Sequence, residues 1–154
     1  MSNLKRSLAE MKEICNQRGS FYFEPDTVRF WGATVHEPAN EWGLFVESYD
    51  SFNREYKLYA VKFFSPDGYV TTIEPADIGK TYEHFPTLEK AMAFRDKLSA
   101  ALAEAANCYR EHKVLSSLAK ISEDGIDTGI YVLTNENGEQ IKINTNNFDR
   151  FICG

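Results

Sequence analysis

The hydrophobic positions near the start of the chain recur with the period of a helix. Four apolar residues lie on one face of such a helix, with charged residues on its other side: Leu4, Leu8, Met11 and Cys15. Ser2 or Asn3 can cap its first turn, and Gly19 can end it. The pattern therefore predicts a helix over residues 3–17.

An aromatic run follows, with the sequence FYFEPDTVRFWG over residues 21–32. Residues 21–23 favour a short strand that ends at Pro25, because proline has no backbone donor for a sheet. Pro25 and the acidic residues beside it suit the first turn of a helix, and Gly32 can end that turn. We therefore expect a strand, a single helical turn and a glycine exit, with most of the rings in the core.

Arg29 and Trp31 are the residues of this run that we single out for function. In a helical turn, Arg29 either pairs with Asp26, three residues before it, or is presented beside Trp31 at the rim of an aromatic patch. Arginine, tryptophan and tyrosine are enriched among the residues that dominate protein interfaces. We therefore predict a partner-binding surface made of Arg29, Trp31, Asp26 and Tyr22.

The clearest local pattern is a β-hairpin. Residues 55–64 and 69–73 are rich in β-branched and aromatic residues, and residues 65–68 between them, SPDG, suit a tight turn. Because both faces of the first strand are largely apolar, we expect it in the middle of a sheet with cover on each side. Within residues 33–53, only residues 43–48 are predicted as a strand, between two loops.

A second helix is predicted to begin at Thr87, which can cap it. The apolar residues on its buried face are Leu88, Met92, Leu98, Leu102, Ala105 and Tyr109. Because a helical period continues through residues 114–121, the helix either runs on to Lys120 or breaks near Asn107.

Residues 122–129 are predicted as an acidic loop, and residues 130–144 as a second hairpin. The order of elements predicts an α+β fold, in which an antiparallel sheet of two hairpins and one or two further strands is packed by an N-terminal helix and a long central helix. Residues 1–106 form the predicted core domain. Residues 107–154 form a helical extension and the C-terminal hairpin, either within the same domain or as a separate unit.

The composition is that of a globular protein, because 43% of the 154 residues are hydrophobic and 14% are aromatic. The formal net charge of −6 argues against sequence-independent binding to a phosphate backbone. Acidic residues concentrate in the segments predicted as sheet, which either keep the protein in solution or meet a basic partner. The sequence also predicts a cytoplasmic protein, since no apolar run reaches the length of a membrane span and the three cysteines have no disulfide or metal spacing.

Two short patterns in the sequence partly match known chemical motifs. Gly79-Lys80-Thr81 is like the end of a phosphate-binding loop, but Glu74 stands where that loop requires a glycine. Cys108 and His112 have the i, i+4 spacing of two metal ligands, with no second pair nearby in the sequence. Because neither pattern completes a site, the sequence predicts a protein that is not an enzyme and that has no cofactor or metal.

The alternative function is nucleic-acid binding by the first strand of the first hairpin. Aromatic rings can stack on bases while cations contact phosphates, and this region contains both kinds of residue: Arg54, Tyr56, Lys57 and Lys62. Apolar side chains share a face with Lys57, so packing in the core is the favoured interpretation of this strand.

The motif F-x-F-x-P-D-T-x-R-F-[FW] at residues 21–31 and the strand YAVKFFSPDG at residues 59–68 resemble those of a family of small uncharacterised proteins from phages and prophages. The resemblance covers about residues 1–97 and brings no catalytic residue with it. It implies an accessory protein of a mobile element.

Together these observations predict a non-enzymatic phage accessory protein that binds a host protein. Its expected role is to inhibit a defence complex, of the anti-CRISPR or anti-restriction type, or a regulatory complex. The expected partner is basic or itself binds nucleic acid, no membrane is involved, and a homodimer is left open.

Overall fold

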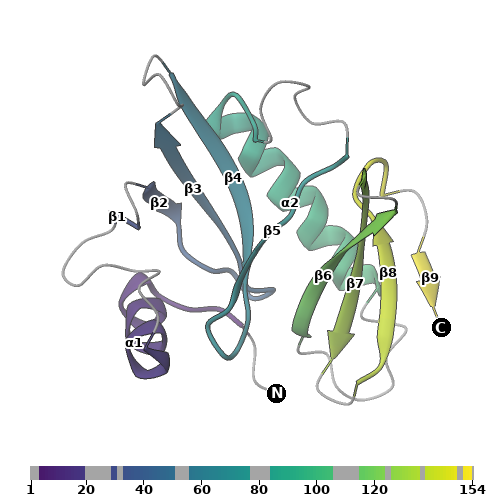
Figure 1. Ribbon diagram of the computed structural model, residues 1–154, viewed down its shortest axis with the longest axis horizontal. Helices are drawn as coiled ribbons and strands as arrows, with labels where there is room; N and C mark the ends of the chain where they lie inside the picture. The colour runs from purple at the N-terminus through teal and green to yellow at the C-terminus, as the bar shows by residue number, and fades with distance from the viewer. Residues whose placement is uncertain are drawn as a thin grey trace.

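A computed structural model of the chain describes residues 4–19, 29–30, 33–50, 56–76, 84–105, 115–123, 126–135, 138–148 and 151–153. Within these residues the chain forms two helices and two antiparallel sheets (Figure 1). The α+β class predicted from the sequence is therefore confirmed. The two predicted hairpins lie in different sheets, whereas the sequence pattern suggested a single sheet.

The first sheet has five strands, which lie in chain order: β1 (Arg29–Phe30), β2 (Ala33–Glu37), β3 (Leu44–Asp50), β4 (Lys57–Phe64) and β5 (Val70–Thr72). The hairpin of β4 and β5 confirms the prediction, and Gly68 in its turn has a positive φ of 87°. β4 lies between β3 and β5, with Val61 packed in the main core and Phe64 in a second cluster on the opposite face. The predicted cover on both sides of this strand is also confirmed.

Two predictions for this sheet were wrong. Arg29 lies in strand β1 and not in a helical turn, because its backbone pairs with Thr34 of β2. Residues 33–37, predicted as a loop, form β2, which pairs with β3 along its length. In both places the hydrogen bonds of the sheet outweigh the local turn preference of a short segment. The strand expected at residues 21–23 lies outside the described residues.

Helix α1 (Leu8–Arg18) begins later than predicted. Its N-cap is Ser7, because Ser7 and Glu10 form a capping box in which each side chain bonds the other residue's backbone. Gly19, with a φ of 80°, ends the helix as predicted. Met11 and Cys15 of α1 are buried against one face of the first sheet.

We expect Ser7→Ala to weaken this helix start by about 1 kcal/mol in urea unfolding at neutral pH. The bond from the Ser7 backbone, followed by the bond with the Ser7 side chain, holds the pKa of Glu10 below its ordinary value. A lowered folded-state pKa contributes stability above the ordinary pKa, and this stability is lost as pH falls through the folded-state value. Ser7→Ala keeps the backbone bond and removes only the side-chain contribution, so the difference between variant and wild type should shrink slightly in acid, and a difference that grows in acid would contradict the prediction.

Helix α2 (Leu88–Ala105) begins where the sequence predicts, with the Thr87 Oγ1 atom accepting a hydrogen bond from the Lys90 backbone at 3.2 Å. The alternative in which this helix runs on to Lys120 is wrong, because residues 115–123 form a strand. The buried face of α2 consists of Ala91, Phe94, Leu98, Ala101, Leu102 and Ala105.

The second sheet has four strands, also in chain order: β6 (Leu115–Glu123), β7 (Ile126–Asn135), β8 (Gln140–Asn144) and β9 (Phe151–Cys153). The hairpin of β7 and β8 confirms the second predicted hairpin. The predicted acidic loop at residues 122–129 is instead largely strand, because the ends of β6 and β7 pair with each other.

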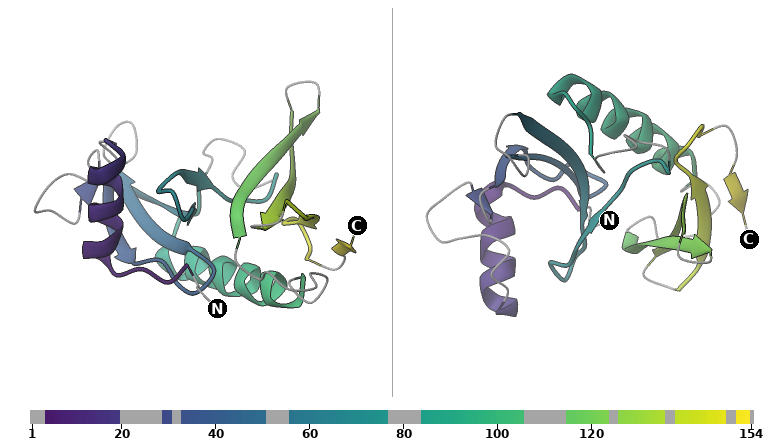
Figure 2. Two further views of the ribbon diagram at one scale, coloured as in Figure 1. Left: turned by 90° about the horizontal axis from the view of Figure 1, so that it is seen from below. Right: turned by 45° about the horizontal axis from the view of Figure 1, so that its top comes forward.

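Helix α2 runs along both sheets, as Figure 2 shows. Tyr131, Leu133, Ile141 and Ile143 of the second sheet belong to the same buried cluster as Val61 of the first sheet and the apolar face of α2. One core therefore joins the two sheets through the helix. The division into residues 1–106 and 107–154 stays a prediction. In the described part of the chain, no helix is long and apolar enough to cross a membrane.

Candidate functional site

The partner surface predicted in the aromatic run falls largely outside the described residues. Tyr22, Asp26 and Trp31 are not described, and Arg29 is described only by its backbone in β1. That surface stays a prediction.

The basic residues predicted for nucleic-acid binding are engaged with carboxylates of the neighbouring strand. Lys62 Nζ lies 3.0 Å from the Glu47 carboxylate, and the Glu47 side chain is only 2% exposed. Lys57 Nζ lies 3.5 Å from the Asp50 carboxylate at the exposed end of the sheet. Both ion pairs join β4 to β3. Tyr56 is exposed, and Arg54 lies outside the described residues.

Only some of the candidate metal ligands lie in the described residues. Cys108 and His112 lie outside the described residues, and Cys15 is buried in the α1 cluster. His36 Nε2 lies 2.6 Å from the Oγ atom of Ser48, so the partner of this histidine is a buried serine hydroxyl of β3. Among the residues that the structure describes, no group of three His, Cys, Asp or Glu residues could hold a metal ion.

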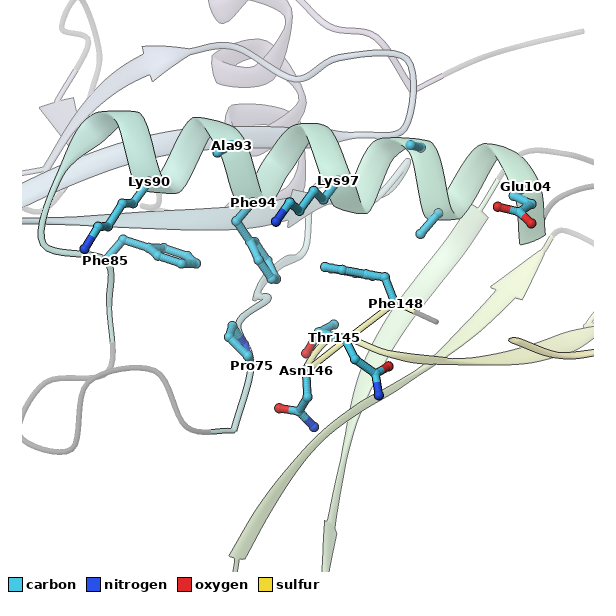
Figure 3. A pocket seen from close by; sticks show the side chains of 13 residues that line it. Pro75, Phe85, Lys90, Ala93, Phe94, Lys97, Glu104, Thr145, Asn146 and Phe148 are labelled. Atoms are coloured by element: carbon cyan, nitrogen blue, oxygen red, sulfur yellow. The ribbon is translucent and has the colours of Figure 1, made fainter. Parts of the chain in front are cut away.

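The feature that stands out is a groove of about 610 Å³ between α2 and the turn that follows β8 (Figure 3). One wall is the helix, and the other is formed by residues 145–148. Pro75, which follows β5, and Phe85, which precedes α2, complete the lining. Pockets of this volume are common as binding sites.

Three aromatic rings form the floor of the groove and point toward one another in Figure 3. The Phe94 ring centroid lies 5.1 Å from that of Phe85 and 5.6 Å from that of Phe148. Phe85 is held by two backbone hydrogen bonds with Tyr59 of β4, at 2.8 and 2.9 Å. The rings are therefore fixed by the fold before any ligand arrives.

Phe148 has an unusual backbone conformation for a residue with a large side chain. Its φ is 57°, in the left-handed region that favours glycine. Its backbone amide donates to the Asn144 carbonyl at 3.0 Å, and its ring packs on Phe94. Such a conformation persists only where the surrounding structure enforces it. Residues of this kind cluster at active sites and ligand-binding sites.

The rim of the groove carries charges at regular intervals along α2. Lys90, Lys97 and Glu104 are exposed and succeed one another every seven residues, so they share one face of the helix. Each step of seven residues is about 10.5 Å along the helix axis. None of the three forms an ion pair with any residue that the structure describes.

A set of polar contacts fixes the second sheet beside the first and so fixes the width of the groove. Asn146 bridges the sheets, because its Oδ1 atom accepts from the Ala76 backbone at 2.8 Å and its Nδ2 atom donates to the Thr128 carbonyl at 3.0 Å. The Tyr131 hydroxyl accepts from the Glu74 backbone at 3.1 Å. The Thr145 hydroxyl donates to the Gly129 carbonyl at 2.5 Å and lies 3.2 Å from the Glu74 carbonyl.

The side chain of Glu74 lies in the same junction. Glu74 is buried, and its carboxylate lies 3.2 Å from the Nδ1 atom of His84, whose ring meets Tyr49 edge-on at 5.1 Å. Glu74, which stands where a phosphate-binding loop requires a glycine, is thus a buried residue of the junction between the sheets. Gly79, Lys80 and Thr81 lie outside the described residues.

Sequence reasoning missed the residues that make this groove. Phe94 is absent from the predicted apolar stripe of α2, and Phe148 is not among the predicted site residues. A large aromatic residue between two lysines that are seven residues apart is the signal that the sequence contained.

Residues 7–96 match the model of a family of unknown function, DUF7447. The match includes α1, the first sheet and the first half of α2, whereas the second sheet lies beyond it. No curated protein and no solved structure is significantly similar to the chain.

Proposed function

Because the chain belongs to DUF7447, a family of unknown function, we propose its function from its own surface: it is a non-enzymatic protein that binds a host protein through the groove beside α2. The aromatic floor of the groove is the observation that carries this proposal. Phe85 and Phe148, which are half-buried and pack on the buried Phe94, offer apolar area that is already ordered, so a partner loses little free energy in arranging it.

The biological setting is an accessory protein of a phage or prophage, acting in the cytoplasm of the bacterial host. The resemblance of residues 21–31 and 59–68 to phage proteins supports this setting. In this role the protein inhibits a host defence complex or a regulatory complex by occupying a surface that the complex needs.

Nucleic-acid binding is the less favoured function. Two of the four residues on which it depends, Lys57 and Lys62, form ion pairs within the first sheet. The net charge of −6 adds a general repulsion of phosphate backbones.

We expect Ala100→Arg to abolish capture of the host protein and Ala103→Arg to leave it unchanged. Both alanines are exposed on the last turns of α2, but only Ala100 lines the groove, so only its substitution places a large cation over the aromatic floor. The measurement is capture from bacterial host lysate by each purified protein, with the stoichiometry of bound host protein determined.

Circular dichroism and thermal unfolding should show that both arginine variants fold like the wild type, since both positions are exposed. Capture of a stoichiometric host protein by the wild type and by Ala103→Arg, with its loss in Ala100→Arg, is the expected result. Equal capture by the two variants, or no stoichiometric partner of the wild type, would contradict the proposal.

A further inference from the structure

The charges on the rim of the groove specify what fits into it. We propose that the occupant is an extended segment of the host protein with two acidic side chains three residues apart, an apolar side chain between them, and a basic side chain three residues beyond the second acid. This inference rests on the proposed binding function and gives it a ligand chemistry.

The size of the groove favours an extended segment over a helix. From Lys90 to Glu104 the groove follows fourteen helical steps, or about 21 Å, so a volume of about 610 Å³ gives a mean cross-section of about 29 Å². A helix about 10 Å wide has a cross-section of about 80 Å². An extended chain, about 4.8 Å wide and 10 Å deep with its side chains, has about 48 Å². The groove therefore accommodates a larger share of an extended chain than of a helix.

The spacing of the rim charges sets the spacing of the charges in the occupant. In a polyproline II conformation, three residues make one turn of about 9.3 Å, so side chains three apart point the same way. This repeat is close to the 10.5 Å between successive rim residues, and flexible side chains can absorb the difference. Aromatic-lined grooves are a known setting for segments in this conformation.

The signs of the rim charges set the order of charges. Lys90 and Lys97 each favour an acidic side chain, and Glu104, one interval further, favours a basic one. Phe94 lies between the two lysines and its ring points into the groove, as Figure 3 shows. The apolar side chain of the occupant therefore belongs between its two acids, where it meets Phe85, Phe94 and Phe148.

Synthetic peptides test this pattern directly. The probe is fluorescein-labelled Glu-Pro-Phe-Glu-Pro-Pro-Arg, together with the same residues in reverse order, because the groove does not fix the chain direction. Prolines favour the required conformation. We expect one of the two to bind in fluorescence anisotropy at low salt, at least about tenfold more tightly than the scrambled peptide Glu-Glu-Phe-Pro-Pro-Arg-Pro, which has the same charges.

Charge-reversed variants assign the contacts. Lys97→Glu should weaken binding about tenfold, because an attraction at the rim becomes a repulsion. Lys142→Glu, on β8 outside the groove, changes the net charge equally and should have less than a twofold effect. Glu104→Lys should reverse the preference, so that a peptide with glutamate in place of arginine binds this variant more tightly than the original peptide does.

The outcomes separate this inference from the proposed function. If no peptide binds, or the scrambled peptide binds equally well, while host-protein capture still depends on Ala100, the charge pattern is wrong and the binding function stands. If sedimentation shows that the wild type forms a dimer that Ala100→Arg disrupts, a second copy occupies the groove and the inference is overturned. If the wild-type protein neither binds the peptides nor captures a stoichiometric host protein, both the inference and the proposed function are overturned.

Discussion

Replacing Lys62 with methionine is expected to lower the free energy of unfolding by about 3 kcal/mol. The Lys62 ammonium lies 3.0 Å from the Glu47 carboxylate, and the two side chains are 17% and 2% exposed. Removing one partner of a buried ion pair leaves the other charge in a poorly solvated place, which is strongly destabilising. The expected value lies at the low end for such pairs, because Lys62 keeps some contact with water.

The matched control for this prediction is Lys57→Met, on the same strand. Lys57 also pairs with a carboxylate of β3, but both side chains are about half exposed, so its loss should change stability by less than about 1 kcal/mol. Urea unfolding of both variants provides the comparison. The double variant Glu47→Leu with Lys62→Met should recover much of the loss, because no charge then remains buried. Equal effects of Lys62→Met and Lys57→Met would contradict the assignment of a buried pair.

Gly129→Ala is expected to destabilise the protein by about 3 kcal/mol and to disturb the groove. Gly129 has a φ of 75°, and a Cβ atom there would lie 2.6 Å from Asn146 Oδ1 and 2.9 Å from the Ala76 backbone nitrogen. The left-handed conformation alone accounts for about 1 kcal/mol with alanine. The remainder comes from displacing Asn146, whose two bridging hydrogen bonds contribute about 1 kcal/mol each.

Gly138→Ala controls for the backbone conformation alone. Gly138 has a similar φ of 82°, but a Cβ atom there would meet nothing within 4 Å. We expect this variant to lose only about 1 kcal/mol in urea unfolding. Gly129→Ala should also weaken host-protein capture, whereas Gly138→Ala should not. A similar stability for the two variants would show that the Asn146 bridge does not hold the sheets together.

The parts of the fold that sequence reasoning predicted are those with strong local signals. Gly68 lies in one hairpin turn and Gly138 in the other, and both have the positive φ that a tight turn requires. Thr87 marks the start of α2 with its own hydrogen bond. Such elements depend on neighbouring residues, so they can be recognised without knowledge of the tertiary structure.

The parts that were missed depend on partners far away in the sequence. Leu118 and Ile121 are three residues apart, which suits a helix, but in the structure Leu118 pairs with Leu133 of β7. Residues 33–37 look like a loop until β3 supplies a partner strand. A short segment with an ambiguous pattern takes the structure that its long-range neighbours impose.

The groove was missed for the same reason. Phe94 is on α2 and Phe148 follows β8, and nothing in the local sequence indicates that their rings meet. Of the predicted nucleic-acid residues, Tyr56, Lys57 and Lys62 could be placed, and the two lysines join strands. Local patterns identify which residues are aromatic or charged, but the packing of α2 on the second sheet decides which of them form a surface.

The two walls of the groove fall on different sides of the end of the family match. The helical wall begins within the region that matches the family, whereas the turn at residues 145–148 lies beyond it. Mutations in that turn can therefore change the shape of the groove while the first sheet keeps its own packing. Exchange of this outer wall alone would reshape the groove without altering the part of the chain that matches the family.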